Sequence, residues 1–153
     1  MALIVQKFGG TSVGNTDKIK AVAERVLKSH KQGNRMVVVL SAMSGETDRL
    51  IRLAKDVQKI PDQRELDMIV STGEQVTVAL FAMAVKEAGY DAVSLLGDQV
   101  RILTSNLHTK ARIKQIDSEL ISKHLDQGKV VVIAGFQGVT EAGDITTLGR
   151  GGS

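Results

Sequence analysis

Lys7, Gly9 and Gly10 carry the chemistry that a phosphate-binding loop needs, and they lie within the segment Lys7–Val13, KFGGTSV. An apolar run, Ala2–Val5, precedes the segment and an amphipathic stretch follows it, which predicts a strand, a turn and a helix. Glycines leave the backbone N–H groups open to a phosphate oxygen, and a helix N-terminus adds donors and a positive dipole end. A lysine supplies the cation that phosphoryl transfer requires. The segment therefore predicts a phosphate cradle.

This cradle differs from the two commonest nucleotide-binding loops. A P-loop places its lysine after the glycines, whereas Lys7 comes before them. The dinucleotide fingerprint G-x-G-x-x-G is not matched by the spacing of Gly9, Gly10 and Gly14. The plain alternative is a tight strand-to-helix turn beside a surface lysine.

Hydroxyl groups follow the second apolar run, Met36–Leu40, at Ser41, Ser44 and Thr47. They could donate hydrogen bonds to a carboxylate or a phosphate. The alternative for Ser44 is an N-cap, for a helix that begins at residue 45 or 46.

Glu74 and Arg150 could bind the charged groups of a small molecule. Glu74 stands at the head of an apolar stretch, where an anion could bind an ammonium group, although Ser71-x-x-Glu74 also has capping-box spacing. Arg150 lies between Gly149 and Gly151, and its guanidinium could hold a carboxylate with two hydrogen bonds. The alternative for Arg150 is a flexible, exposed side chain.

The composition narrows the function classes. The 153 residues include no cysteine and carry a net charge of +3 without a run of like sign. Aromatic residues make up 3%, which leaves little for nucleic-acid bases to stack on.

There is no signal peptide and no run of 18 apolar residues, so we expect neither export nor a membrane span, and the lack of cysteine suits the cytoplasm. The three histidines share no metal-ligand spacing, and we expect any metal to be Mg²⁺ carried by a nucleotide.

Apolar runs alternate with helical periodicity, which predicts an α/β sandwich with a mainly parallel sheet. We expect strands at 2–5, 36–40, 92–96, 101–104 and 130–134, a hairpin of 139–140 with 145–147, and helices at 16–32, 46–58, 61–70, 75–88 and 118–126. Helix 46–58 should turn Leu50, Ile51, Leu53, Ala54 and Val57 inward, and helix 75–88 should be buried all round or lie at an interface. Four segments should leave strands at the carboxyl edge of the sheet and form one polar site: Lys7–Ser12, Ser41–Thr47, Gly97–Gln99 and Gly135–Gly138.

Together, these residues resemble the aspartate kinases, a branch of the amino acid kinase family. The motifs that carry the resemblance are KFGGTSV at 7–13, VVLSAMSG at 38–45, STGE at 71–74, GFQG at 135–138 and TLGRGGS at 147–153. The resemblance implies a three-layer α/β/α fold and ATP-dependent phosphorylation of the β-carboxylate of L-aspartate. It implies catalytic roles for Lys7 and Glu74. It implies ATP contacts from Lys7, Phe8, Gly9, Gly10 and Ser12, and aspartate contacts from Ser41, Thr47, Glu74, Arg150, Gly151, Gly152 and Ser153.

The resemblance also implies that residues 1–153 are the amino-acid-binding part of a longer homo-oligomeric protein. Because the sequence stops inside a glycine-rich loop, we expect a truncated chain that lacks the nucleotide lobe and the C-terminal ACT domains and turns over ATP poorly. Other readings are a glutamate 5-kinase, an acetylglutamate kinase, a non-catalytic amino-acid-binding or assembly module, and a nucleic-acid-binding protein.

Overall fold

A parallel sheet, sheet A, has the strand order β1-β2-β6-β3 in the computed structural model, which describes residues 1–149. The strands pair in register, with Phe8 beside Leu40, Leu40 beside Ala134 and Leu95 beside Ile133. All carboxyl ends of sheet A therefore meet at one edge. The strands span Leu3–Phe8 (β1), Arg35–Leu40 (β2), Ala92–Leu95 (β3) and Val130–Ala134 (β6).

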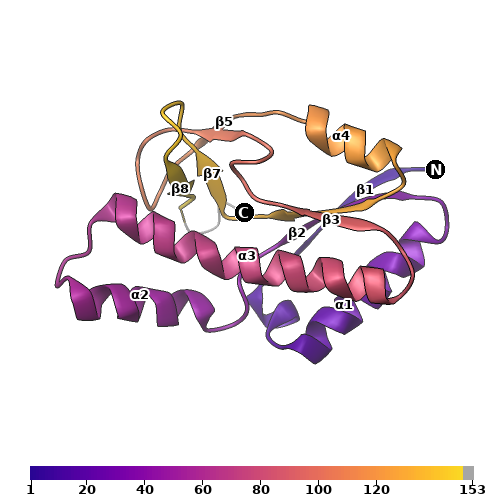
Figure 1. The fold of residues 1–153 in the computed structure, drawn as a ribbon, viewed down its shortest axis with the longest axis horizontal. Helices are drawn as coiled ribbons and strands as arrows, with labels where there is room; N and C mark the ends of the chain where they lie inside the picture. Colours follow the sequence, from indigo (N-terminus) through magenta and orange to yellow (C-terminus); the bar gives the residue numbers. More distant parts are fainter. Residues whose placement is uncertain (150–153) are drawn as a thin grey trace.

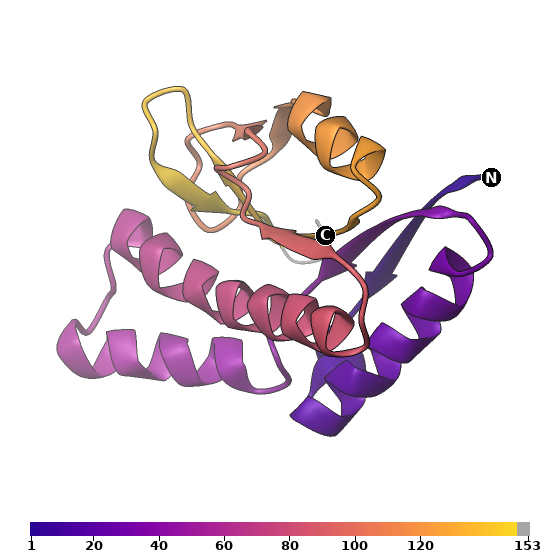
Figure 2. The same cartoon turned by 45° about the vertical axis from the view of Figure 1, so that its right-hand side comes forward.

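Helices cover both faces of sheet A, as Figures 1 and 2 show. On one face, α1 and α3 pack their apolar side chains against the sheet around Phe81, Ile19 and Met36. On the other face, Leu125 of α4 packs against Val131 with part of a second sheet. This arrangement confirms the expected three-layer α/β/α fold. The helices span Thr16–His30 (α1), Glu46–Val57 (α2), Gln63–Glu87 (α3) and Glu119–Asp126 (α4), and the 3-10 helix η1 spans Gly10–Val13.

A second, mixed sheet, sheet B, has the order β5-β4-β7-β8. The sequence predicted the β7–β8 hairpin and β4, but neither β5 nor the separation into two sheets. All four residues of β5 are exposed, so no buried apolar pattern marks it. The strands span Ile102–Thr104 (β4), Ile113–Ile116 (β5), Gln137–Val139 (β7) and Ile145–Thr147 (β8).

Helix α3 runs without a break from Gln63 to Glu87, so the expected interruption at residues 71–74 is wrong. The hydroxyls of Ser71 and Thr72 donate to carbonyls one turn earlier in the same helix instead of capping a new one. Gly73 permits close packing rather than a turn, because a Cβ atom there would lie 3.0 Å from the Cβ of Ala42.

Among the helices of residues 1–149, α3 alone is long and apolar enough to cross a membrane by length and composition. Half of its most apolar window is buried, against α1, α2 and sheet A. The other side of α3 exposes Val76 and Met83, so the helix is not buried all round within the described chain, and the alternative of an interface stays a prediction.

The N-termini of α1 and α2 differ in how they are capped. Asn15 caps α1, accepting a hydrogen bond from the backbone N–H of Lys18. The N-cap of α2 is Gly45, with φ of 81°, so the expected cap at Ser44 is wrong. A left-handed residue is needed there, and glycine adopts that conformation at little cost.

The inward face of α2 is narrower than expected. Leu50 and Ala54 are buried, but Leu53 and Val57 are 48% and 90% exposed. In the described chain, α2 packs mainly on α3, so the outer part of its apolar face stays uncovered.

An added methyl group at Gly138 should disturb the packing of sheet B. A Cβ atom there would lie 2.4 Å from Thr104 Cγ2 and 2.5 Å from the carbonyl oxygen of Ile102. We expect Gly138→Ala to lower the free energy of unfolding by about 3 kcal/mol, measured by urea denaturation. The control is Gly9→Ala, where a Cβ meets nothing within 4 Å. Equal stability of the two variants would contradict this account.

Candidate functional site

The loops that leave sheet A at its carboxyl edge lie against one another. The backbone N–H of Ser41 donates to the carbonyl oxygen of Phe8 at 3.3 Å, and that of Gly135 donates to Leu40 at 3.0 Å. The N–H of Gly97 donates to Gln137 Oε1 at 3.3 Å. These contacts link the ends of all four strands, which confirms that the four predicted segments converge.

Lys7 lies inside β1, paired in register with Val39, and its side chain is exposed. The expected end of the strand at Val5 is therefore wrong. The apolar pattern did not extend to Lys7 because β1 is an edge strand. In such a strand exposed and half-buried residues alternate, and a lysine can occupy a position that faces solvent.

Gly9 and Gly10 form the turn after β1, but α1 does not follow them directly. The backbone of Ser12 donates to the carbonyl oxygen of Gly9 at 3.0 Å and opens η1, and α1 begins only at Thr16. The N–H groups near the glycine pair thus belong to a short 3-10 turn, not to the α-helix expected from the sequence. A Cβ at Gly10 would lie 3.1 Å from the carbonyl oxygen of Ala42, so this glycine lets the first two loops touch.

Ser41 and Thr47 lie on the second of these loops. Ser41 directly follows β2 and Thr47 is in the first turn of α2, and both are half-buried. Because this loop touches the glycine turn, its hydroxyls share an edge with Lys7.

Glu74 reaches this edge from α3 and is 3% exposed. Its Oε1 accepts a hydrogen bond from Gln137 Nε2 at 3.1 Å, while Oε2 is buried without a partner among residues 1–149. Burial raises the pKa of Glu74 to about 7, although the amide of Gln137 and the N–H groups of Gly135 and Phe136 favour the charged form. A buried carboxylate oxygen that lacks a hydrogen-bond partner is suited to pair with a cation. The capping-box alternative for Glu74 is wrong, since α3 is continuous there.

Gln137 belongs to the site, although the sequence indicated only the motif around it. It is 3% exposed, donates to the carbonyl oxygen of Ser71 at 3.0 Å and to Glu74, and accepts from the backbone of Gly97. The available signal was a polar residue three positions after the buried strand, within the segment Gly135–Gly138.

Two strand spacings separate β1, which carries Lys7, from β6, beside whose end Glu74 lies. This spacing amounts to about 10 Å. The edge therefore has a cationic end near the glycine turn and an anionic end at Glu74, with the hydroxyls of Ser41 and Thr47 between them. The predicted site residues Arg150, Gly151, Gly152 and Ser153 lie outside the described residues.

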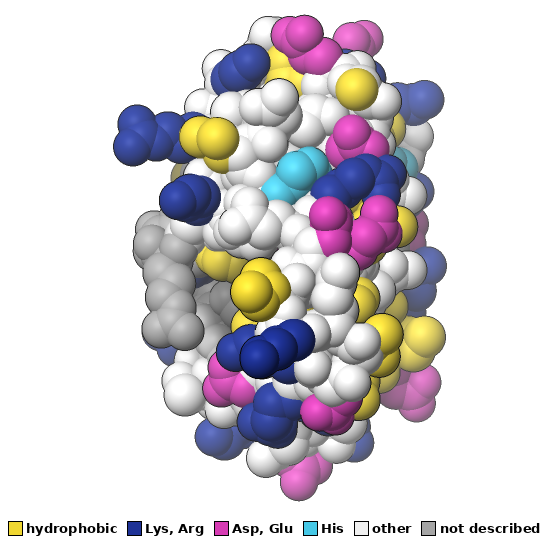
Figure 3. Space-filling model, turned by 90° about the vertical axis from the view of Figure 1, so that its left-hand side faces the viewer, with side chains coloured by type: hydrophobic (Ala, Val, Ile, Leu, Met, Phe, Trp, Pro, Cys, Tyr) yellow, Lys and Arg dark blue, Asp and Glu magenta, His cyan; other side chains and the backbone are white. Residues whose placement is uncertain are grey.

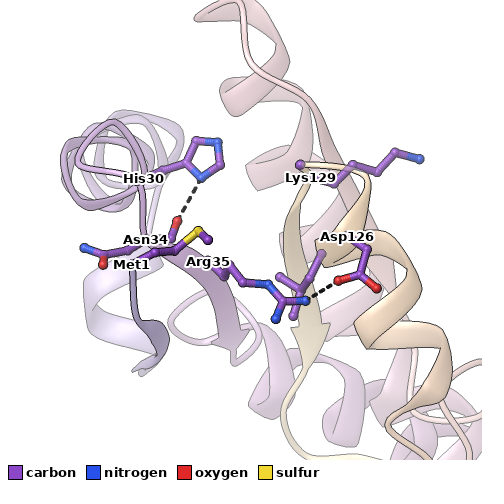
Figure 4. A pocket seen from close by; sticks show the side chains of 9 residues that line it. Met1, His30, Asn34, Arg35, Asp126 and Lys129 are labelled. Atoms are coloured by element: carbon purple, nitrogen blue, oxygen red, sulfur yellow. Dashed lines mark hydrogen bonds and ion pairs between the residues drawn. The ribbon is translucent and has the colours of Figure 1, made fainter.

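A hollow of about 380 Å³ opens at the opposite edge of sheet A, between the ends of α1 and α4 (Figure 4). Arg35 there is already paired with Asp126 at 2.7 Å. Both helices present their C-terminal ends, His30 and Asp126, to this region, and the negative end of a helix dipole repels anions. The hollow thus lacks the features of a phosphate site.

Within residues 1–149, no three side chains of His, Cys, Asp or Glu gather as metal ligands. Among residues 1–149, the carboxyl edge of sheet A brings together a lysine near the end of β1 and the unpartnered carboxylate oxygen of Glu74 on α3.

Comparison with known proteins gives a consistent result. The model of the amino acid kinase family matches residues 2–153. Over its whole length the chain is 63% identical to an aspartate kinase of Stutzerimonas stutzeri and covers 37% of it, so the chain spans a little over a third of that relative. The fold matches that of aspartate kinase from Synechocystis with a TM-score of 0.80 and 46% identity, covering 97% of this chain and 24% of that one. Aspartokinase III of E. coli, in complex with aspartate and ADP, shares the fold with a TM-score of 0.85 at 24% identity, covering 99% of this chain and 44% of that one.

Proposed function

The chain belongs to the amino acid kinase family, and we propose that it is part of an aspartate kinase. The reaction proposed is the transfer of the γ-phosphoryl group of ATP to the β-carboxylate of L-aspartate, giving 4-phospho-L-aspartate. The supporting relatives include the aspartate kinase that is 63% identical over this whole chain. Within that protein, residues 1–153 would be the amino-acid-binding part, and a nucleotide lobe and ACT domains would follow.

The observation that carries this proposal is the buried carboxylate of Glu74 at the carboxyl edge of sheet A, with Oε2 unpartnered among residues 1–149. An amino acid brings an ammonium group that can pair with this oxygen and replace the missing hydrogen bond. N-acetylglutamate has no ammonium group, so the site favours aspartate or glutamate over the substrate of an acetylglutamate kinase.

Each remaining residue takes a role that suits its position. Lys7, exposed at the end of β1, would stabilise charge on the transferring phosphoryl group. Phe8, Gly9, Gly10 and Ser12 would contact the phosphates of ATP through the open backbone of the turn. Ser41 and Thr47 would donate to the carboxylates of aspartate, together with Arg150, Gly151, Gly152 and Ser153.

In this reaction, the main contribution of the chain would be to position aspartate relative to the γ-phosphoryl group. With the ammonium of aspartate on Glu74, the β-carboxylate would extend toward Lys7, so that one carboxylate oxygen attacks the γ-phosphorus while ADP leaves. Mg²⁺ bound to the nucleotide would neutralise the phosphates. E. coli aspartokinase III, which shares the fold, binds aspartate and ADP.

The setting proposed for the enzyme follows from its proposed substrates. We place it in the cytoplasm as a homo-oligomer, at the first step toward lysine, methionine and threonine, without a nucleic-acid or membrane partner.

Substrate preference tests this proposal. The full-length protein, supplied with MgATP and hydroxylamine, should form aspartyl hydroxamate, with kcat/KM for aspartate at least about 100-fold above that for glutamate or N-acetylglutamate. A preference for glutamate or N-acetylglutamate would favour a glutamate 5-kinase or an acetylglutamate kinase. Turnover of none of the three would favour a non-catalytic module.

A further inference from the structure

Helix α3 changes its packing halfway along its length. Its C-terminal half packs on sheet A through apolar side chains such as Phe81 and Val85, both fully buried. Its N-terminal half instead buries Asp67, Ser71 and Glu74, which are 0, 7 and 3% exposed. Spacings of four and three residues place these three on one face of the helix.

The β7–β8 hairpin holds this polar face at two points. Gln137 and Thr147 are direct cross-strand partners, so their side chains leave the same face of the hairpin. Gln137 Nε2 donates to Ser71 O at 3.0 Å and to Glu74 Oε1 at 3.1 Å, and Thr147 Oγ1 donates to Asp67 Oδ1 at 2.6 Å. The two carboxylates are seven residues apart, about 10 Å along the helix. We call Asp67, Ser71, Glu74, Gln137 and Thr147 the polar seam.

Asp67 also contacts His108 and Thr109, in the segment between β4 and β5. His108 Nδ1 lies 2.8 Å from its Oδ2, and the backbone N–H of Thr109 donates to both carboxylate oxygens, at 3.0 and 3.1 Å. Thr109 has φ of 69°, an unfavourable conformation for a β-branched residue. Such a conformation persists only where the surroundings hold it, and here the hydrogen bond to Asp67 does so.

An exposed ion pair also joins α3 to the β7–β8 hairpin, at the surface of the molecule. Arg64 of α3 bonds Asp144 of the hairpin loop at 2.8 Å, with both side chains more than a third exposed. This side of the molecule carries acidic and basic side chains intermixed (Figure 3). Exposed pairs contribute little to stability, so the seating of α3 on the hairpin depends on the buried seam.

We propose that Asp67 is a positioning residue for aspartate binding. By fixing α3 against the hairpin, Asp67 places the Glu74 carboxylate, and with it the unpartnered Oε2, at the carboxyl edge of sheet A. Buried hydrogen bonds are directional, so the seam sets one seating of the helix where an apolar contact would allow sliding. The inference rests on the proposed function, because it takes the ammonium group of aspartate as the partner of Glu74.

Thr147→Val in the full-length protein is the main test. Valine keeps the shape of threonine but cannot donate to Asp67, so α3 should shift at Glu74. Because Glu74 would hold the ammonium equally in the ground state and the transition state, we expect KM for aspartate to rise about tenfold. We expect kcat and KM for ATP to stay within about twofold. Asp67→Asn should act in the same direction and more strongly, since its NH₂ group would face the donors that now bond Asp67.

Two control variants separate positioning from general stability. Arg64→Ala breaks the exposed link between the same elements and should leave KM for aspartate unchanged. Val78→Ala opens a cavity in the apolar half of α3 and should lower Tm without raising KM. An unchanged KM in Thr147→Val, or an equal rise in Val78→Ala, would overturn the role of the seam.

The test also separates the seam from the proposed function. A wild-type protein that does not phosphorylate aspartate would refute the function itself. The crystal structure of Thr147→Val would then decide the seam: a displaced Glu74 that has lost its contact with Gln137 supports it, and an unmoved Glu74 overturns it.

Discussion

Lys7→Met in the full-length protein is expected to lower kcat for aspartate phosphorylation about 10³-fold, with KM for aspartate changed less than about threefold. Negative charge grows on the oxygens around the transferring phosphoryl group, and a single preorganised cation typically contributes 10²-fold or more to such a step. Lys7 lies near the carboxyl end of β1, beside the glycine turn and the loops that converge there. Steady-state kinetics with a coupled ADP assay measures the effect.

Two further variants make this result specific. Lys7→Arg keeps the charge but changes its geometry, so it should retain more activity than Lys7→Met. Lys20→Met removes an exposed cation of α1 and should behave like the wild type. A Lys7→Met enzyme with more than about a tenth of the wild-type kcat would exclude the proposed role of Lys7.

Glu74→Gln is expected to raise KM for aspartate about 10² to 10³-fold, because the ammonium group would lose its buried anionic partner. The amide of glutamine has nearly the shape of the carboxylate, so the loss reports charge rather than packing. Isothermal calorimetry with aspartate should show the same loss of affinity in the absence of ATP. Unchanged aspartate binding would place the ammonium group elsewhere.

The pH dependence of the wild type gives an independent check on Glu74. Burial raises the pKa of Glu74 to about 7 in the unliganded protein, so the carboxyl group is increasingly protonated below that pH. A neutral carboxyl cannot pair with an ammonium ion, and kcat/KM for aspartate should fall about tenfold per pH unit below about 7. In Glu74→Gln this limb of the profile should disappear.

A fall in pH should weaken aspartate binding through Glu74, but it should increase the contribution of this residue to the stability of the fold. The pKa of Glu74 is raised from 4.5 to about 7, so the folded state holds a proton that the unfolded state releases. The corresponding stability is present below about pH 4.5 and is lost as the pH rises to about 7. At about pH 8 and without ligand, the free energy of unfolding of Glu74→Gln should therefore be about 1–3 kcal/mol higher than that of the wild type. Urea denaturation at two pH values checks this sign.

The sequence predicted the parts of the fold whose signal is local. The strand at Val130–Ala134 is an unbroken apolar run because it is buried on both faces, and the helix expected from residue 16 begins there as α1. Since parallel strands end at one edge, the polar segments after them could be grouped into one site before their contacts were known.

Features that depend on tertiary contact could not be predicted. The glycine at position 73 is a break signal by itself, and only its contact with Ala42 shows that it serves close packing. Lys7 lies in a strand because β2 pairs with it, which overrides its polar character. The seam pairs Asp67 with Thr147 across 80 positions, and neither residue carries a local signal for the other.

The strand order of sheet A has a consequence for how the chain folds during synthesis. The central strand β6, at Val130–Ala134, lies between β2 and β3 but is the last of the four to leave the ribosome. Until β6 emerges, the inner edges of β2 and β3 have no partner, and their apolar residues stay open to wrong pairing. Long-range parallel pairing of this kind is slow. The nascent chain should therefore depend on chaperones up to residue 134 and acquire protease resistance in one late step.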